Sequence, residues 1–124
     1  MIDDYFIEFS KIISHLDIIT YHSVTKKKID DYSGVIRGKI YIDNYCLKFL
    51  EVIFLFNNPQ NQKKKYSYHF MDGNKALVFR YDNAYHHREI KTFPHHKHLP
   101  DRVIETTEPD IKSVIKEIRK YLNK

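Results

Sequence analysis

The chain has 124 residues, of which 42% are hydrophobic and 30% are charged, and its formal net charge is +5 at pH 7. The length predicts one domain spanning residues 1–124, and this hydrophobic content excludes a disordered chain. The positive charge favours an anionic partner, while the single cysteine, Cys46, excludes an intramolecular disulfide and fits a reducing cytoplasm.

The first half of the chain predicts one helix and three strands. Residues 3–16 carry Phe6, Phe9 and Leu16 at helical spacing, with acidic residues at the start, which predicts an amphipathic helix. Strands are predicted over residues 18–24, 34–43 and 45–56. The last of these is apolar almost throughout, which is typical of a strand that is covered on both faces.

A hairpin is the clearest feature of the second half. Residues 65–71 and 76–82 flank the turn signal Asp72-Gly73. Alternation along the two strands predicts an apolar core face with Tyr66, Tyr68, Phe70, Leu77, Phe79 and Tyr81. The opposite face is polar and brings His69, Arg80 and Asp82 within reach of one another.

The chain closes with a predicted helix over residues 106–122. Thr107 is the expected N-cap and Asp110 completes a capping box. An apolar stripe follows at helical spacing: Ile111, Val114, Ile115, Ile118 and Leu122. The order of elements predicts an α+β fold, in which N- and C-terminal helices pack against an antiparallel sheet of about five strands.

Residues 79–99, "FRYDNAYHHREIKTFPHHKHL", concentrate five histidines within thirteen positions: His86, His87, His95, His96 and His98. A transition metal is one interpretation, since imidazole is a common ligand. Neighbouring histidines on an extended chain point to opposite sides, so at most one of each pair would converge with His98. The helical His-Glu-x-x-His pattern is absent. We therefore expect no native metal site and no cofactor.

Two other interpretations are open on the residues alone. Metal-free cleavage of RNA needs a base, an acid and a cation on the phosphate, and imidazole titrates near neutral pH. Arg80, Asp82, Lys97 and the histidines are residues of the right types. Alternatively, the histidines donate ordinary structural hydrogen bonds in a rigid loop, and Arg80–Asp82 is a structural ion pair.

The segment around residues 66–98 resembles the TumE-type family of small prokaryotic proteins. The family pattern falls on Tyr66 and Tyr68, Gly73, residues 79–84 ("FRYDNA"), the pair at 86–87, and residues 92–98 ("TFPHHKH"). The strand containing Arg37 and Gly38 is similar to the family's upstream region. The chain departs from the pattern at Tyr85 and Arg88, where the family tends to carry proline. The resemblance implies the toxin of a toxin–antitoxin pair, with a helix-turn-helix antitoxin as partner.

With this resemblance, we expect a toxin that acts on RNA, as a candidate metal-independent ribonuclease. The candidate catalytic residues are Arg80, Asp82, His86, His87, His95, His96 and His98. In this hypothesis Arg80 holds phosphate, Asp82 orients a histidine, and the histidines include the acid and the base. The candidate substrate-binding residues are Arg37, Lys39, His69, Asn83 and Lys97.

The alternatives are a non-enzymatic inhibitor that binds RNA or a protein through its basic face, and a regulatory partner of a DNA-binding protein. The acidic N-terminus is unlike a signal peptide, and the longest apolar run, Leu50–Phe56, is too short to cross a bilayer. We therefore expect a cytoplasmic protein without membrane contact. Homo-oligomerisation is left open.

Overall fold

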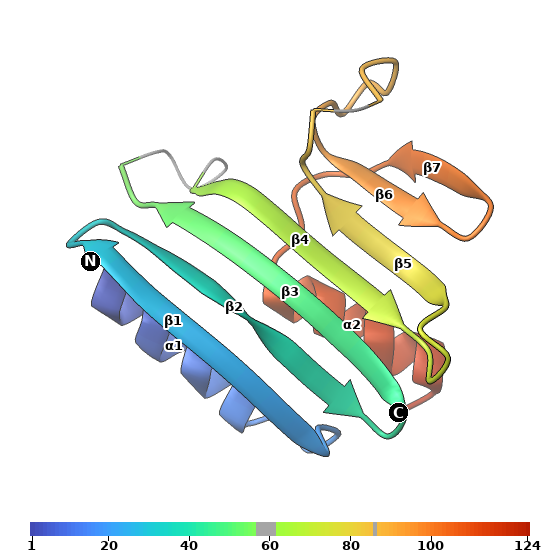
Figure 1. Cartoon of the computed structure of the whole chain (residues 1–124), viewed down its shortest axis with the longest axis horizontal. Coiled ribbons are helices and arrows are strands. Elements are labelled where there is room, and N and C mark those ends of the chain that lie inside the picture. The colour runs from blue at the N-terminus through green and yellow to red at the C-terminus, as the bar shows by residue number, and fades with distance from the viewer. Residues whose placement is uncertain (57–61, 86) are drawn as a thin grey trace.

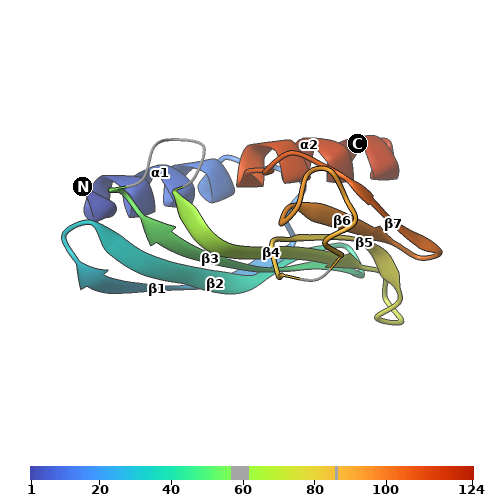
Figure 2. The ribbon, with the colours of Figure 1, turned by 90° about the horizontal axis from the view of Figure 1, so that it is seen from above.

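The computed structural model of the chain describes residues 1–56, 62–85 and 87–124. These ranges contain two helices and seven strands: α1 (Ile2–Ser14), β1 (Tyr21–Asp30), β2 (Ser33–Ile42), β3 (Tyr45–Phe54), β4 (Lys63–Met71), β5 (Leu77–Asp82), β6 (His96–Leu99), β7 (Arg102–Glu105) and α2 (Ile111–Leu122). The strands pair in chain order and antiparallel, as one sheet (Figure 1). Both helices lie on the same side of that sheet (Figure 2). We call this side the helix face and the other side the open face.

The core lies between the sheet and the two helices. Side chains of β2–β5 that point to the helix face are almost fully buried, among them Ile40, Phe49, Tyr68 and Phe79. α1 contributes Phe9, whose ring centroid lies 5.4 Å from that of Phe49. The predicted apolar face of the β4–β5 hairpin is confirmed for Tyr66, Tyr68, Phe70, Phe79 and Tyr81. The prediction is wrong at the start of β5, where a register shift pairs Leu77 with Met71 and Val78 packs against the core in place of Leu77.

α2 begins later than the sequence predicts. Its N-cap is Asp110, whose side chain accepts a 2.8 Å hydrogen bond from the Ser113 N–H, so the predicted N-cap Thr107 is wrong. The preceding residues are held by other partners: the Thr106 N–H donates to Thr92, and the Pro109 carbonyl accepts from Lys63. Among the described helices, neither has the length and apolar character needed to span a bilayer.

The predicted α+β class is confirmed, but the expected five strands are seven. The additional pair, β6 and β7, has four residues in each strand, and β6 lies within the histidine-rich segment. These strands lack the apolar alternation that marks a strand in a sequence. They are defined by their pairing in the sheet, β6 with β5 and β7 with β6. The expectation that residues 45–56 are covered on both faces is wrong, because Lys48 on the open face of β3 is exposed.

Candidate functional site

The pairing of β5 with β6 gathers four of the candidate site residues on the open face. Arg80 lies opposite His98 in the sheet, and Asp82 lies opposite His96. The Asp82 Oδ1 atom is 2.7 Å from His96 Nε2, and Asp82 Oδ2 is 2.9 Å from Arg80 Nε and 3.6 Å from His98 Nε2. A single buried carboxylate therefore accepts a hydrogen bond from a guanidinium and lies next to two imidazoles.

His87 joins this group from the loop between β5 and β6. Its ring centroid lies 5.3 Å from that of His96 and 5.6 Å from that of His98. Its backbone has a φ of 54°, in the left-handed region that costs energy for residues other than glycine. Its Nδ1 atom is 3.3 Å from Glu89 Oε1. We name Arg80, Asp82, His87, His96 and His98 the Asp82 cluster.

The contacts of His96 determine which of its ring nitrogens carries a proton. Its side chain is 1% exposed, and its Nδ1 atom is 2.9 Å from the Pro94 carbonyl oxygen. A carbonyl can only accept, so Nδ1 carries the proton and donates. Nε2 is close to Asp82 by distance, but the geometry is not that of a hydrogen bond, and the atom has no hydrogen-bond partner among the described residues. The buried Nε2 is therefore fixed in place and incompletely satisfied.

His98 is the more accessible imidazole that faces the carboxylate. Its Nε2 atom lies 3.4 Å from Arg80 Nη2, and a guanidinium can only donate, so Nε2 presents a lone pair. Burial lowers the pKa of His98, and the adjacent Arg80 charge lowers it further. Both observations favour a neutral His98 near pH 7.

A row of basic side chains leads across the open face to this cluster. Directly paired positions place Lys39 (β2), Lys48 (β3), His69 (β4), Arg80 (β5) and His98 (β6) side by side. Cross-strand partners share one face, and neighbouring strands are about 4.8 Å apart, so the row extends over roughly 19 Å. We call it the basic row.

The charges of the basic row are not balanced along its length. Lys39 and Lys48 are exposed and form no ion pair with any residue that the structure describes. Burial lowers the pKa of His69, and Arg80 and Lys48 lower it further, which favours its neutral form. Side chains of like charge directly opposite one another repel, so the row would be stabilised by a bound anion.

The other candidate residues lie elsewhere. Arg37 is exposed on the open face, one row from Lys39. Asn83 closes the end of the β4–β5 pair, accepting from the Tyr66 N–H and donating to the Lys64 carbonyl. Lys97 points to the helix face, where its Nζ atom is 2.6 Å from Glu117 on α2. His86 lies outside the described residues.

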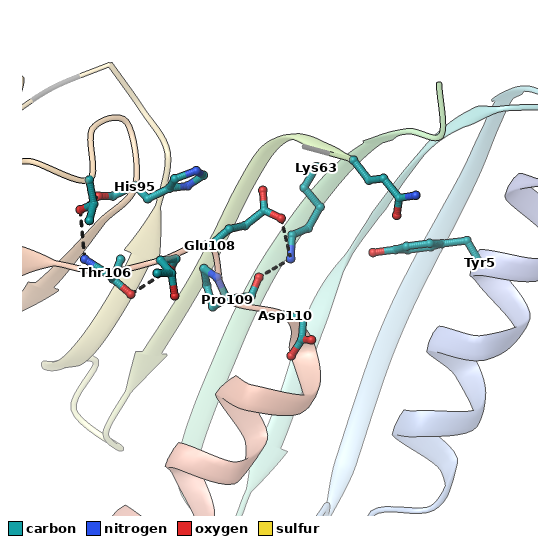
Figure 3. Close-up of a pocket in the computed structure, with 10 residues that line it drawn as sticks. Tyr5, Lys63, His95, Thr106, Glu108, Pro109 and Asp110 are labelled. Atoms are coloured by element: carbon teal, nitrogen blue, oxygen red, sulfur yellow. Dashed lines mark hydrogen bonds and ion pairs between the residues drawn. The ribbon is translucent and has the colours of Figure 1, made fainter. Parts of the chain in front are cut away.

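His95 belongs to a different site, on the helix face. Its Nδ1 atom is 2.8 Å from the Tyr66 hydroxyl, and its ring stacks on that of Tyr66 with centroids 5.7 Å apart. It lines a pocket of about 640 Å³ between α1, the start of β4 and the segment before α2 (Figure 3). We call this the helix-side pocket. The expectation that only one histidine of a neighbouring pair joins His98 is confirmed for His95 and His96.

Buried charge distinguishes the helix-side pocket. The Lys63 side chain is 6% exposed, donates to the Pro109 carbonyl and lies 4.0 Å from Glu108 (Figure 3). Burial raises the pKa of Glu108, and its Oε1 atom has no hydrogen-bond partner among the described residues. Burial and the Lys63 charge lower the pKa of His95. Nearby, Glu51 accepts hydrogen bonds from Tyr5 and Tyr68.

Comparison with known proteins adds one finding to this geometry. The family model described as "Toxin TumE" matches residues 8–123, nearly the whole chain. The chain belongs to the TumE toxin family. No curated protein and no solved structure gives a significant match. Membership of this family indicates a toxin role and, as for toxins of such pairs in general, an antitoxin partner.

Sequence reasoning about this TumE family member missed two features. Lys48 was not among the expected binding residues, although the turn at Asp43-Asn44 joins strands that pair Ile42 with Tyr45 and hence Lys39 with Lys48. That signal was available in the sequence. The pairing of Lys63 with Glu108 was not available, because the two residues are 45 positions apart and no local pattern connects them.

Proposed function

We propose that this toxin acts on RNA, whose phosphodiester chain lies along the basic row and reaches the Asp82 cluster. The observation that carries the proposal is the basic row itself. Three side chains with permanent charge, Lys39, Lys48 and Arg80, lie on one uncovered face and lead to a buried carboxylate and its imidazoles. Rows of Lys and Arg attract the phosphate backbone independently of sequence.

The Asp82 cluster has the groups that phosphodiester chemistry requires. Arg80 is bound to Asp82 through Nε, and its side chain is 40% exposed, so the guanidinium can also meet a phosphate. His98 and His87 are partly accessible and can face a substrate, whereas His96 is buried and acts as a positioning residue. Imidazoles that can accept or donate a proton, beside a guanidinium on the phosphate, are suited to RNA cleavage.

The same face is the proposed contact for a helix-turn-helix antitoxin. A partner that covers the basic row would exclude RNA and so neutralise the toxin. Co-expression of the toxin with the product of the adjacent gene, followed by pull-down, is the measurement. We expect the pair to co-purify, and we expect reversal of the charges of Lys39 and Lys48 to weaken the association. If the two proteins elute separately at micromolar concentration, the product of the adjacent gene is not the antitoxin of this protein.

Growth arrest on induced expression tests the RNA proposal. Lys39→Glu/Lys48→Glu should relieve the arrest and preserve cellular RNA, because the basic row becomes acidic. Lys116→Glu/Lys120→Glu is the matched control, since it changes net charge equally on exposed positions of α2. Arrest by both double variants alike, or arrest with RNA intact, would contradict action on RNA through the open face.

The inhibitor alternative predicts a different pattern of variants. A protein that only occupies its target loses affinity in graded steps of about 1 kcal/mol per contact. A catalytic site instead contains at least one side chain whose loss abolishes arrest while folding and RNA binding survive. Arrest that declines only in proportion to RNA affinity would favour occupancy.

A further inference from the structure

We propose that the Asp82 cluster is a transition-metal site, with the Asp82 carboxylate, His96 Nε2 and His98 Nε2 as ligands. One ligand atom from each of these residues lies within 4.8 Å of the others. Two imidazoles and one carboxylate form a familiar set for zinc and for iron, cobalt or manganese. The proposal goes beyond action on RNA and does not depend on it.

The contacts around these residues match those that orient metal ligands. A ligating histidine usually donates its other ring N–H to a carbonyl or carboxylate, which fixes the ring and its tautomer. His96 does this through Nδ1 to the Pro94 carbonyl at 2.9 Å. The carboxylate is oriented in turn by Arg80 Nε, at 2.9 Å from Oδ2.

His87 lies beside this set, although it is not among the residues whose ligand atoms lie within 4.8 Å of one another. Its Nδ1 atom is 3.3 Å from a Glu89 carboxylate oxygen, which repeats the carboxylate–histidine pattern. The centroids of the His87, His96 and His98 rings are 4.8–5.6 Å apart, with planes inclined by 61–74°. Three imidazoles on one tetrahedral zinc, with bonds of about 2.0–2.1 Å, would have centroids roughly 5 Å apart.

The incomplete bonding of His96 is the second observation that indicates a ligand. Nε2 is buried 2.7 Å from Asp82 Oδ1 without the geometry of a hydrogen bond. A lone pair on Nε2 would be repelled by the carboxylate, so a positive charge is needed at this atom, from a second ring proton or from a metal ion. A cation between the two atoms removes that repulsion and satisfies both.

Loading the site requires small movements. Two ligand atoms on a tetrahedral ion are about 3.3 Å apart, so His96 Nε2 and Asp82 Oδ1 would separate by roughly 0.6 Å. The 3.4 Å contact between Arg80 Nη2 and His98 Nε2 would open, and Arg80 is accessible enough to move. Arg80 can keep its Nε contact with Asp82 and turn its other nitrogens to an anion.

The site, if loaded, changes the roles expected from the sequence. His96 and His98 would be ligands and not proton carriers, so the metal-free mechanism would not apply to them. Bound water on a transition metal has a lowered pKa and can supply the nucleophile. The protein would then hold the metal ion beside Arg80, so that the ion and the Arg80 guanidinium could bind the same anion.

Metal binding to the intact, untagged protein tests this proposal directly. The protein is stripped with a chelator, titrated with Zn²⁺, and assayed for bound metal after gel filtration and for thermal unfolding. We expect one equivalent per chain and a rise in Tm of roughly 10 °C at a hundredfold excess over Kd. His98→Gln, at a partly accessible position, should weaken binding at least about 100-fold without unfolding the protein.

His22→Gln is the matched control, because it removes an exposed histidine of β1 that lies outside the cluster. It should bind zinc as the wild type does. Failure of the wild type to retain zinc, or equal binding by the His22 and His98 variants, would overturn the metal site. The zinc titration contains no RNA, so a failure to bind zinc would not contradict the proposed action on RNA. Stoichiometric zinc in a protein that does not arrest growth would contradict only the proposed action on RNA.

Discussion

His95 and His96 are neighbours in the sequence and belong to different regions of the molecule. His96 lies on the open face beside Asp82, in a cluster reached by an uncovered row of cations. His95 lies on the helix face against Tyr66, in a pocket where the buried Lys63 lies 4.0 Å from Glu108. The alternation of an extended chain produces this division, since successive side chains point to opposite faces. We infer that the open face carries activity and that the helix-side pocket carries stability.

Replacing each of these two histidines in turn should give the greatest difference in activity. His96→Gln should reduce RNA cleavage by about 10²–10⁴-fold, because it removes the buried imidazole that positions Asp82 or binds a metal in the Asp82 cluster. His95→Gln should leave cleavage within a few-fold of wild type. Cleavage rates at equal folded concentration are the measurement. Equal losses in the two variants would mean that the faces are not functionally distinct.

The buried polar groups next to the helix-side pocket should affect stability when they are mutated. Tyr68→Phe removes a hydroxyl that donates to Glu51, a carboxylate that is 1% exposed. The loss of a hydrogen bond to a buried charge should reduce the free energy of unfolding by about 1.5–3 kcal/mol. Denaturant unfolding measures this. Unchanged stability would contradict this stabilising role. Lost activity in protein that remains folded would place function on the helix face as well.

Salt dependence gives a smaller and more specific signal from the open face. Three permanent charges in the basic row predict a slope of about −2 for log K against log salt with single-stranded RNA. Binding should therefore weaken roughly 20-fold between 50 and 200 mM salt. Lys48→Gln should reduce the steepness by about 0.7, whereas Lys116→Gln on α2 should not change it. Identical slopes for both variants would exclude the basic row as the RNA contact.

The smallest effect concerns Glu108. Burial raises its pKa in the folded protein, so the folded state binds more protons than the unfolded state as the pH rises above the ordinary glutamate value. Stability should therefore fall with rising pH through that window. Glu108→Gln should remove this dependence and change stability at pH 7 by about 1 kcal/mol or less, in the stabilising direction. Unfolding curves from pH 4 to 7 would show it, and an unchanged pH profile would contradict the assignment.

Much of this arrangement follows from the sequence, and the limits have physical causes. The β4–β5 hairpin predicts that Arg80 and Asp82 share the polar face, because side chains alternate from Phe79 to Asp82. The register shift between Phe79 and Leu77 was not predicted. The sequence did not predict which histidines contact Asp82, because β6 is a four-residue strand without a hydrophobic pattern. Its position depends on pairing with β5, and that pairing also decides which of His95 and His96 reaches the carboxylate.

NMR titration of isotopically labelled protein with a short RNA would show which face of the sheet binds RNA. The His98→Gln variant would be used so that the RNA stays intact. We expect the amide signals of Lys39, Lys48, His69 and Arg80 in the basic row to shift on titration. The amide signals of the helix-side pocket, at Thr106, Thr107, Glu108 and Asp110, should not shift. Shifts confined to residues 106–110, or none at saturating RNA, would contradict the assignment of the open face as the functional surface.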